Sequence, residues 1–558
     1  MRIGVFICHC GLNIAGVIDI PKVMKSVKDF ENVVYVEDNI YSCSASGTER
    51  IRDSISEHDL DRVVVAACTP RTHEYLYRSI CAEAGLNPYL FQFVNIREQC
   101  SWVHTGEPED ATKKAIELIR MGVAKAALLE PLEEKEVEVE PSAMVIGAGV
   151  AGMTAALSIA KHGFRVYLIE KKPEVGGMLE DHNLLFPTDQ DASELLELYK
   201  DEINREGKIK LLTSTTLKKV DGFIGNFNVT VERQGEEVNF RVGAIIVATG
   251  AVAFEPKGLY GYSEHENVMT QFQFQKAFKN KKIGNPNNVV MIQCAGSRGA
   301  PGGVPYCSRI CCMSALKNAV HIKERNTNAK VYILFREMQT HGPLYEDYYK
   351  RAKEKGVRFV RYDLEKQPEV TKKNGELKVK VYNKVLQEEI EIPSDLVVLS
   401  TPLVPPQDAK DLSEILRVSL GMDNFFLETH IKLRPAEFTT DGIYLCGTAH
   451  APKDIHESVI NALGAAAKAL IPLEKGRVKA EAMTARINED ICIGCGKCVN
   501  VCPYEAISLD EIEGVAKVVE VMCKGCGSCS VKCPVGAVQI SFYKDEQILA
   551  MIDNLFVS

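Results

Sequence analysis

Two groups of four cysteines lie within 42 residues near the end of the sequence. Both follow the spacing Cys-x2-Cys-x2-Cys-x3-Cys-Pro, which places three thiolates around one iron–sulfur cubane while the fourth reaches a second cubane. Zinc is the alternative, because CxxC pairs also suit tetrahedral zinc, but two full copies with the trailing proline favour clusters. We predict two [4Fe-4S] clusters, one held by Cys492, Cys495, Cys498 and Cys533, the other by Cys523, Cys526, Cys529 and Cys502.

A third set of four cysteines lies in a long loop between a predicted strand, residues 288–294, and a predicted helix that starts near Met313. The set consists of Cys294, Cys307, Cys311 and Cys312. In a Rossmann unit this loop would hold the phosphates of a nicotinamide cofactor, and the helix end and loop amides would equally stabilise an anionic cluster. A disulfide plus two buried thiols is the alternative. We predict one [4Fe-4S] cluster here and no binding of NADH.

The N-terminal cysteines lie at predicted strand ends or in loops, so a parallel sheet would bring them to one edge. We predict that Cys10, Cys43, Cys68 and Cys100 hold a fourth [4Fe-4S] cluster. Cys8 competes with Cys10 for one position. The alternative of cysteines that only pack is stronger here, because no tight spacing supports ligation.

A dinucleotide fingerprint, Gly147-x-Gly149-x-x-Gly152, follows a buried strand and opens a helix of small residues. Its glycines let the backbone approach a pyrophosphate at the helix N-terminus, and Glu170, 18 residues past the last glycine, can bind ribose hydroxyls. An NAD site is the alternative, but the later segments AIIVATG and DGIYLCG favour FAD. The predicted FAD-binding residues are Gly147, Gly149, Val150, Ala151, Gly152, Glu170, Lys171, Gly177, Met178, Ala248, Thr249, Gly250 and Gly447.

Lys317 lies five residues beyond Cys312 on the helix that follows the cysteine loop. If that loop faces the flavin, the ammonium group would favour the reduced, anionic forms of the ring system. We therefore predict a catalytic role for Lys317. A solvated surface lysine is the alternative.

Composition and pattern define the framework that must position these groups. The 558 residues are 46% hydrophobic and 25% charged, which excludes disorder and a coiled-coil rod. The net charge of −9 gives no basic footprint for nucleic acid, and no apolar run reaches the ~20 residues of a membrane helix. A cytoplasmic protein is expected, in which clusters among 19 cysteines more often bind metal than form disulfides.

Alternating strand and helix patterns predict an α/β protein of several domains. The N-terminal α/β domain covers residues 1–133 and is followed by a Rossmann-like FAD domain at 142–472. A second Rossmann-like half, at about 287–403, is nested in the FAD domain and carries the third cysteine set. The ferredoxin-like 2[4Fe-4S] domain covers 485–543, and a helix is predicted at 544–558.

The order of these motifs carries a resemblance over nearly the whole chain. The FAD segments resemble thioredoxin reductase, and the terminal repeat resembles a bacterial two-cluster ferredoxin. Together with FICHCG at the start and the Cx12Cx3CC loop, they resemble the iron–sulfur flavoprotein (A-type) component of heterodisulfide reductase from methanogens. The resemblance implies flavin-based electron bifurcation within methanogenesis: electron pairs from a hydrogenase or formate dehydrogenase are split between ferredoxin and disulfide-reducing B- and C-type subunits. It also implies a homodimer within a larger complex, with no membrane span.

Two departures from that family leave alternatives open. Larger members carry a ferredoxin-like insertion in the FAD domain that this chain lacks, and some have cysteines where Asp191-Ala192-Ser193 stands here. A straight flavin and iron–sulfur relay, as in quinone-interacting or sulfur-metabolism complexes, is therefore the second hypothesis. A third is an NAD(P)H-dependent disulfide reductase with an attached ferredoxin, but no redox-active CxxC lies outside the terminal repeat.

Overall fold

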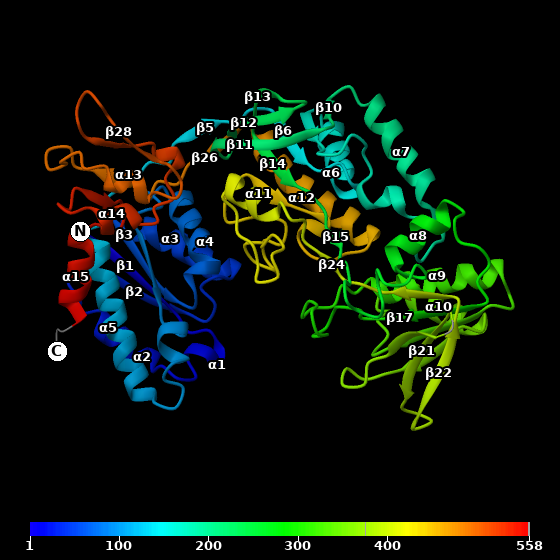
Figure 1. The fold of residues 1–558 in the computed structure, drawn as a ribbon. Helices are drawn as coiled ribbons and strands as arrows, with labels where there is room; N and C mark the ends of the chain where they lie inside the picture. The colour runs from blue at the N-terminus through cyan, green and yellow to red at the C-terminus, as the bar shows by residue number, and fades with distance from the viewer. Residues whose placement is uncertain (374, 556–558) are drawn as a thin grey trace. The chain divides into compact units, whose positions relative to one another are not determined.

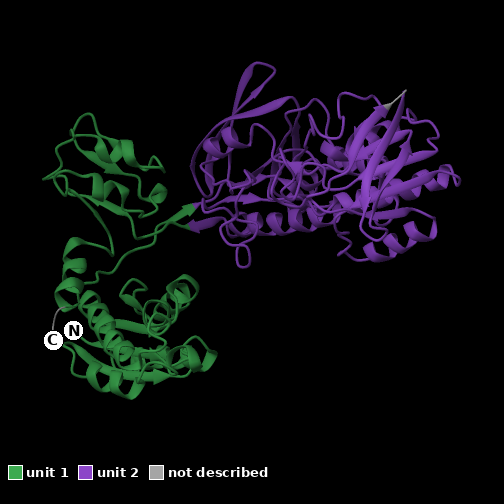
Figure 2. Cartoon of the chain, turned by 60° about the horizontal axis from the view of Figure 1, so that its bottom comes forward, with its two compact units in different colours: residues 1–137, 479–558 green, residues 138–478 purple. Residues whose placement is uncertain are grey.

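A computed structural model describes residues 1–373 and 375–555 of the chain. It contains two compact units, one formed by residues 1–137 together with 479–558 and the other by residues 138–478 (Figure 2). The segments predicted as the N-terminal domain and the ferredoxin-like domain both belong to the first of these units. No helix in the described part of the chain combines the length and apolar character needed to cross a membrane.

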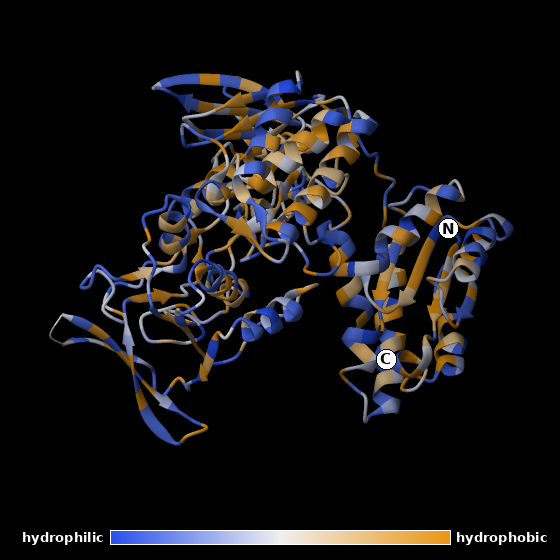
Figure 3. Cartoon of the chain, turned by 90° about the vertical axis from the view of Figure 1, so that its right-hand side faces the viewer, coloured by the Kyte–Doolittle hydropathy of each residue, from blue (hydrophilic) through white to orange (hydrophobic). Residues whose placement is uncertain are grey.

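The N-terminal part of unit 1 is a four-stranded parallel sheet with strand order β2-β1-β3-β4 (Figure 1). The strands are β1 (Ile3–Cys8), β2 (Val33–Asn39), β3 (Arg62–Ala67) and β4 (Phe91–Asn95). Helices α2 (Ile20–Val27), α3 (Ala45–Glu57), α4 (Pro70–Glu83) and α5 (Pro108–Ala127) connect or follow them. Because β1 is covered on both faces, its sequence is hydrophobic at almost every position (Figure 3).

The C-terminal part of unit 1 is built from two short antiparallel strand pairs and two short helices. The pairs are β27 (Ala485–Ile487) with β30 (Val538–Ile540) and β28 (Ile507–Leu509) with β29 (Ala516–Val518); the helices are α13 (Lys497–Val501) and α14 (Ser528–Lys532). Helix α15 (Asp545–Leu555) packs against α5, and Gln547 Nε2 donates to Leu128 O over 2.9 Å. Residues 556–558 of the helix predicted at 544–558 lie outside the described residues.

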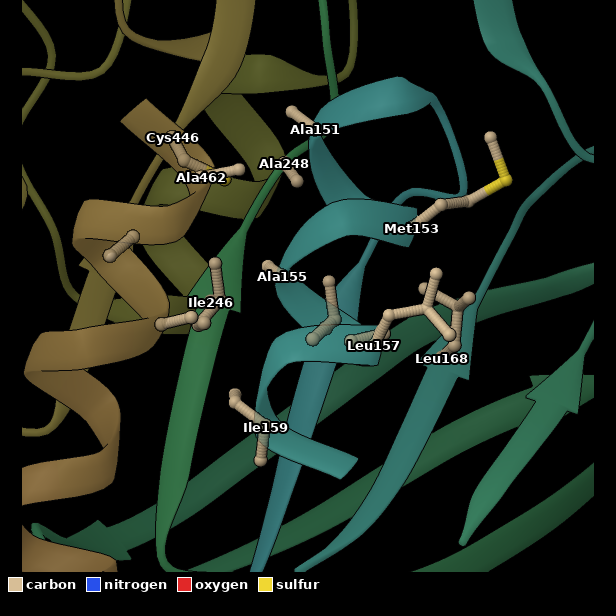
Figure 4. Packing of buried hydrophobic residues seen from close by; sticks show 14 of the residues in the cluster. Ala151, Met153, Ala155, Leu157, Ile159, Leu168, Ile246, Ala248, Cys446 and Ala462 are labelled. Carbon is tan, nitrogen blue, oxygen red and sulfur yellow. The ribbon is translucent and has the colours of Figure 1, made fainter. Parts of the chain in front are cut away.

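Unit 2 contains a five-stranded parallel sheet of order β10-β7-β6-β14-β25. The strands are β6 (Ser142–Ile146), β7 (Arg165–Ile169), β10 (Ile209–Leu212), β14 (Ala244–Val247) and β25 (Ile443–Leu445). Helices α6 (Val150–Lys161) and α12 (Ile455–Lys475) pack against each other, with Ala155 and Ala462 buried beside Ile246 of β14 (Figure 4). Small side chains allow this close packing and fix the start of α6 beside the end of β6.

The nested half of unit 2 has its own five-stranded parallel sheet of order β16-β23-β17-β18-β19. Its elements are β16 (Val268–Thr270), α8 (Gln271–Lys279), β17 (Asn288–Ile292), α9 (Cys311–Arg325), β18 (Lys330–Phe335), α10 (Tyr345–Glu354), β19 (Arg358–Arg361) and β23 (Leu396–Leu399). Two antiparallel sheets accompany the parallel ones: β11 (Thr215–Phe223), β12 (Asn226–Arg233) and β13 (Glu236–Val242), and β20 (Glu369–Lys373), β21 (Glu376–Asn383) and β22 (Glu388–Ser394). The predicted α/β class, with two Rossmann-like halves, is confirmed.

The chain connects the two units twice, and the two connecting segments form one short strand pair. Strand β5 (Glu136–Glu138) pairs with β26 (Arg477–Lys479). Within unit 1, Ala480 N donates to Lys135 O over 2.8 Å, and within unit 2, Val139 N donates to Gly476 O over 3.0 Å. Unit 2 is therefore inserted into unit 1 through two adjacent connections.

Candidate flavin and iron–sulfur sites

A cavity of about 340 Å³ lies where β6 ends and α6 begins. Eleven of the thirteen residues predicted to bind FAD line it; Gly152 and Gly447 do not. Those two lie behind the lining: a Cβ on Gly152 would meet Gly147 O, and a Cβ on Gly447 would meet the Cβ of Ala151 at 2.7 Å. They shape the cavity by letting its walls approach each other.

The glycine loop forms a cradle for a phosphate group. Gly147 has φ +101°, and a Cβ there would lie 2.5 Å from Ala248 O. A Cβ on Gly149, by contrast, would meet no heavy atom within 4 Å, so this residue leaves free space at the start of α6. Backbone N–H groups at a helix N-terminus bind phosphate well, and these residues fit the pyrophosphate of a dinucleotide.

Glu170 joins this loop to the end of β7. Its Oε2 accepts a hydrogen bond from Ala148 N over 2.8 Å, and its Oε1 accepts one from Lys172 N over 2.9 Å. The carboxylate is buried yet lines the cavity, which fits the predicted role of binding ribose hydroxyls. Lys171 also lines the cavity and pairs with Asp408 at 2.7 Å.

Lys317 lines the same cavity from α9 and is only 2% exposed, so the alternative of a solvated surface lysine is wrong. Its Nζ donates to Leu184 O over 2.7 Å and to Gln275 Oε1 over 2.8 Å. Burial lowers the pKa of Lys317 to about 7. Burial, followed by the charge of Lys317, lowers the pKa of the neighbouring His182 to about 3, so this imidazole is neutral. Lys317 is therefore a buried ammonium group whose hydrogen-bond partners are neutral oxygen atoms.

The third cysteine set adjoins this cavity through Cys311. Cys294 follows β17 with φ +58°, and Cys311 opens α9 and lines the cavity. Burial raises the pKa of the Cys311 thiol well above its usual value, and Cys312, Cys307 and Cys294 raise it further, which places all four thiols near one another. All four are free thiols, so the structure contains no disulfide bond among them. Four converging sulfur donors fit one [4Fe-4S] cluster.

In the terminal repeat, a small cavity is lined by Cys492, Cys495 and Cys498 of the first repeat and by Cys533 of the second. This is the set predicted for the first cluster. Burial alone would raise the pKa of Cys533, but backbone N–H donors, Ala537 N over 3.2 Å among them, lower it below its usual value. Amide donors directed at sulfur favour the thiolate that iron requires.

The second terminal set shows the same kind of contact. Burial raises the pKa of Cys529 to about 11, with further contributions from Cys523 and Cys526. Ala506 N donates to Cys502 Sγ over 3.4 Å, four residues on, as Ala537 does to Cys533 in the other repeat. Within the described residues no three side chains of the usual kinds converge on a site for a single metal ion. A cubane differs in taking each thiolate on a separate iron atom.

At the edge of the N-terminal sheet, the structure groups a different set from the predicted one. Burial raises the pKa of Cys10, and Cys8, Cys68 and Cys43 raise it further, so these four thiols lie together. Cys100 lies elsewhere: its Sγ donates to Ala111 O over 3.1 Å, and burial raises its pKa to about 11 without a contribution from another cysteine. The reason is the π-helical turn Arg97–Ser101 after β4, which directs Cys100 toward α5.

The sequence placed Cys8 and Cys10 as competitors for one position, whereas the structure places both with Cys43 and Cys68. Cys8 ends β1 and Cys10 directly precedes a helical turn, so both residues lie at the same end of this strand. The Cys-x-Cys spacing at a strand end was the available signal for two ligands rather than one.

Comparison with known proteins first defines the class. Residues 141–466 match the family model described as pyridine nucleotide-disulphide oxidoreductase, and residues 485–540 match that described as 4Fe-4S dicluster domain. A solved structure of T. acidophilum thioredoxin reductase is 19% identical, with a TM-score of 0.43, and covers 60% of this chain and 99% of its own. The chain is an oxidoreductase with an FAD domain and iron–sulfur clusters.

Full-length relatives then define the family. The A-type iron-sulfur subunit (copy 1) of CoB–CoM heterodisulfide reductase from Methanopyrus kandleri is 40% identical, over 100% of this chain and 98% of its own. The A-type subunit of H2:CoB-CoM heterodisulfide,ferredoxin reductase from Methanothermobacter thermautotrophicus is 39% identical, over 99% and 97%. The chain belongs to this family, the A-type subunits of heterodisulfide reductase. The Methanopyrus alignment spans 657 positions against 558 residues here, so that relative carries about 99 residues without a counterpart.

Proposed function

We propose that this chain is the electron-dividing subunit of a heterodisulfide-reductase-like complex. Bound FAD would accept electron pairs and supply the two-electron to one-electron conversion. Ferredoxin and a disulfide-reducing partner with B- and C-type subunits would receive the electrons. A hydrogenase or formate dehydrogenase would supply them, and the name of the Methanothermobacter relative joins H2, a heterodisulfide and ferredoxin in the same way. A homodimer in the cytoplasm is the form in which we expect the chain to assemble.

One observation carries the proposal: four cysteines occupy the loop after β17, where a Rossmann unit would bind a nicotinamide cofactor. Cys311 lines the flavin cavity, so a cluster held by this loop would adjoin the flavin. Electrons would then reach or leave the flavin through iron and sulfur rather than as a hydride. This favours an iron–sulfur partner over NADH.

We assign four [4Fe-4S] clusters to the chain. The two terminal sets and the Cys294 set keep the ligands predicted from the sequence, and the N-terminal set becomes Cys8, Cys10, Cys43 and Cys68. Lys317 is the proposed catalytic residue. With a pKa lowered by burial to about 7, its ammonium group can stabilise negative charge in the cavity or give up a proton near neutral pH.

Substitution of one proposed ligand tests whether the cysteine loop after β17 holds a cluster. Cys294→Ala is expected to remove one cluster's worth of iron and acid-labile sulfide while FAD remains bound. Cys446→Ala is the matched control, because Cys446 is a buried free cysteine of the same unit outside the proposed sets. Unchanged iron in Cys294→Ala, or an equal loss in the control, would overturn the assignment.

The straight relay is the second candidate. The about 99 residues of the Methanopyrus relative that have no counterpart here favour it, because a branch of the electron path can reside in them. An anaerobic redox titration of the purified chain separates the two. Electron division requires a flavin that bleaches in a two-electron step with hardly any radical signal by EPR. A flavin radical that is stable over a wide potential range would instead establish the relay. Rapid bleaching by NADH or NADPH would contradict both.

A further inference from the structure

Three titratable side chains are hydrogen-bonded in series beside the flavin cavity. Lys453, which precedes α12, lines the cavity, and its Nζ lies 3.0 Å from Nδ1 of His450. His450 Nε2 lies 2.8 Å from Oε2 of Glu428. His450 follows the short helical turn Gly447–Ala449, and Glu428 lies in the segment between α11 (Ala409–Leu416) and β25.

The inner end of this series lies on the side of the cavity where the cysteine loop is found. Arg309, between Cys307 and Cys311, donates to Pro452 O over 3.1 Å and to Glu457 Oε2 over 3.0 Å. Pro452 directly precedes Lys453, so the cysteine loop and the ammonium group adjoin the same part of the cavity. An electron arriving from this loop and a proton leaving Lys453 would therefore meet there.

The outer end of the series reaches solvent. The side chain of His450 is 18% exposed and that of Glu428 is 11% exposed.

Further charged or titratable groups act on the three side chains from neighbouring segments: Arg309, Glu457, Cys446 and Asp423.

We propose that Glu428, His450 and Lys453 form the path by which protons move between solvent and the flavin cavity. This inference rests on the proposed function, in which clusters and not a hydride donor reduce the flavin. A hydride carries its own proton, whereas electrons from iron–sulfur clusters carry none. Each two-electron reduction of FAD takes up at least one proton, and the protein must supply it.

The hydrogen bonds define how a proton moves. With Lys453 donating to Nδ1, the ring hydrogen lies on Nε2 and is donated to Glu428. This arrangement, assigned from the partners, carries a proton outward when the flavin is oxidised. When Lys453 gives a proton to bound, reduced flavin, the other tautomer would carry one inward. Nδ1–H would pass its proton to the neutral amine, and Nε2 would take a proton that Glu428 has first accepted from water. The electrons would come from reduced clusters, and each proton that Lys453 gives up would be taken up by the bound flavin.

The acidities suit this role. Burial, followed by the charge of Arg309, lowers the pKa of Lys453 to about 8. Burial, followed by the charge of Lys453, lowers the pKa of His450, which is thereby neutral and able to accept a proton. Groups that exchange protons near neutral pH are the most efficient acid–base catalysts at that pH.

The test uses the full chain loaded with its cofactors. Anaerobic protein is reduced rapidly by methyl viologen radical, and proton uptake from weak buffer is followed with a pH-indicator dye beside the absorbance of the flavin. His450→Gln can keep both hydrogen bonds but carries no proton. It is expected to slow proton uptake ~10²-fold, with bound FAD unchanged, and added imidazole is expected to restore much of the rate. Glu428→Gln provides a second variant with a smaller expected effect.

His162→Gln is the matched control, because His162 is an exposed histidine at the end of α6, bonded to Ser158 O, and is expected to behave as wild type. Wild-type proton uptake in both His450→Gln and Glu428→Gln, with FAD bound and reduced, would overturn the proton path alone. A slowed rate that imidazole leaves unchanged would show a structural role and would also overturn it. A wild-type chain that binds no FAD would overturn the proposed function together with the path.

Discussion

Gly152→Ala is expected to weaken FAD binding strongly while the chain still folds. A Cβ at this position would lie 1.8 Å from Gly147 O, and no real Cβ approaches a heavy atom closer than 3.0 Å. The glycine loop would therefore move by about 1.2 Å relative to α6. Overpacking of this kind costs ~1–3 kcal/mol. The empty loop can relieve this strain by moving, and FAD binding must then restore it, so the cost falls on binding. Because ~1.4 kcal/mol is tenfold in affinity, FAD binding should weaken ~5- to 150-fold.

The assay is a titration of the cofactor-depleted protein with FAD, followed by the quenching of flavin fluorescence. Gly464→Ala is the control, because it lies inside α12, where a Cβ meets no heavy atom within 4 Å. Alanine there should leave FAD affinity unchanged and stabilise the helix by ~0.5–1 kcal/mol. Wild-type FAD affinity in Gly152→Ala would refute the argument from close approach.

Three further results are expected. Cys533→Ser and Cys492→Ser should each remove one cluster. The double variant should lose no more iron than either one, because both cysteines are assigned to the same proposed cluster; additive loss would contradict the exchange of ligands between repeats. Measured iron content should fall in Cys43→Ala and stay at the wild-type level in Cys100→Ala. Iron loss in Cys100→Ala would favour the ligand set predicted from the sequence, which contains Cys100. Burial lowers the pKa of Lys317 to about 7, below its unfolded value of ~10.4, so the unfolded chain binds more protons between these values and stability rises with pH. The gain in unfolding temperature from Lys317→Met should thus shrink from pH 7 to pH 9, and a constant gain would contradict the burial.

The residues that the structure groups as the sequence analysis grouped them are those encoded by short spacing. The ligands around Cys492 lie within one turn-rich loop, and the glycines around Gly149 lie within one strand–helix junction, so the local chain determines their geometry. Cys100 failed this condition. Its position depends on a π-helical turn after β4 and on packing against α5, neither of which the spacing of cysteines encodes.

Two other features could not be predicted from the sequence, because they too depend on contacts between distant segments. The grouping of the N-terminal sheet with the ferredoxin-like segment in one unit depends on contacts across more than 340 residues, such as the Lys125 ammonium group over the ring of Phe542. The series from Lys453 to Glu428 joins a helix start to a distant loop. The sequence contains one sign of this series. His450 and Lys453 lie three residues apart, just before the helix that ends the flavin domain.

Because unit 2 is inserted into unit 1, the two parts of unit 1 are synthesised at different times. The 341 residues from Glu138 to Val478 separate the strands β1–β4 from the segment that completes their unit. At ~5–20 residues per second, a ribosome takes ~17–70 s to traverse them. Throughout this interval the surface of α5 that α15 covers stays bare. Docking of α15 can therefore occur only after all of unit 2 has been synthesised, and a chain that terminates within unit 2 leaves this surface of α5 uncovered.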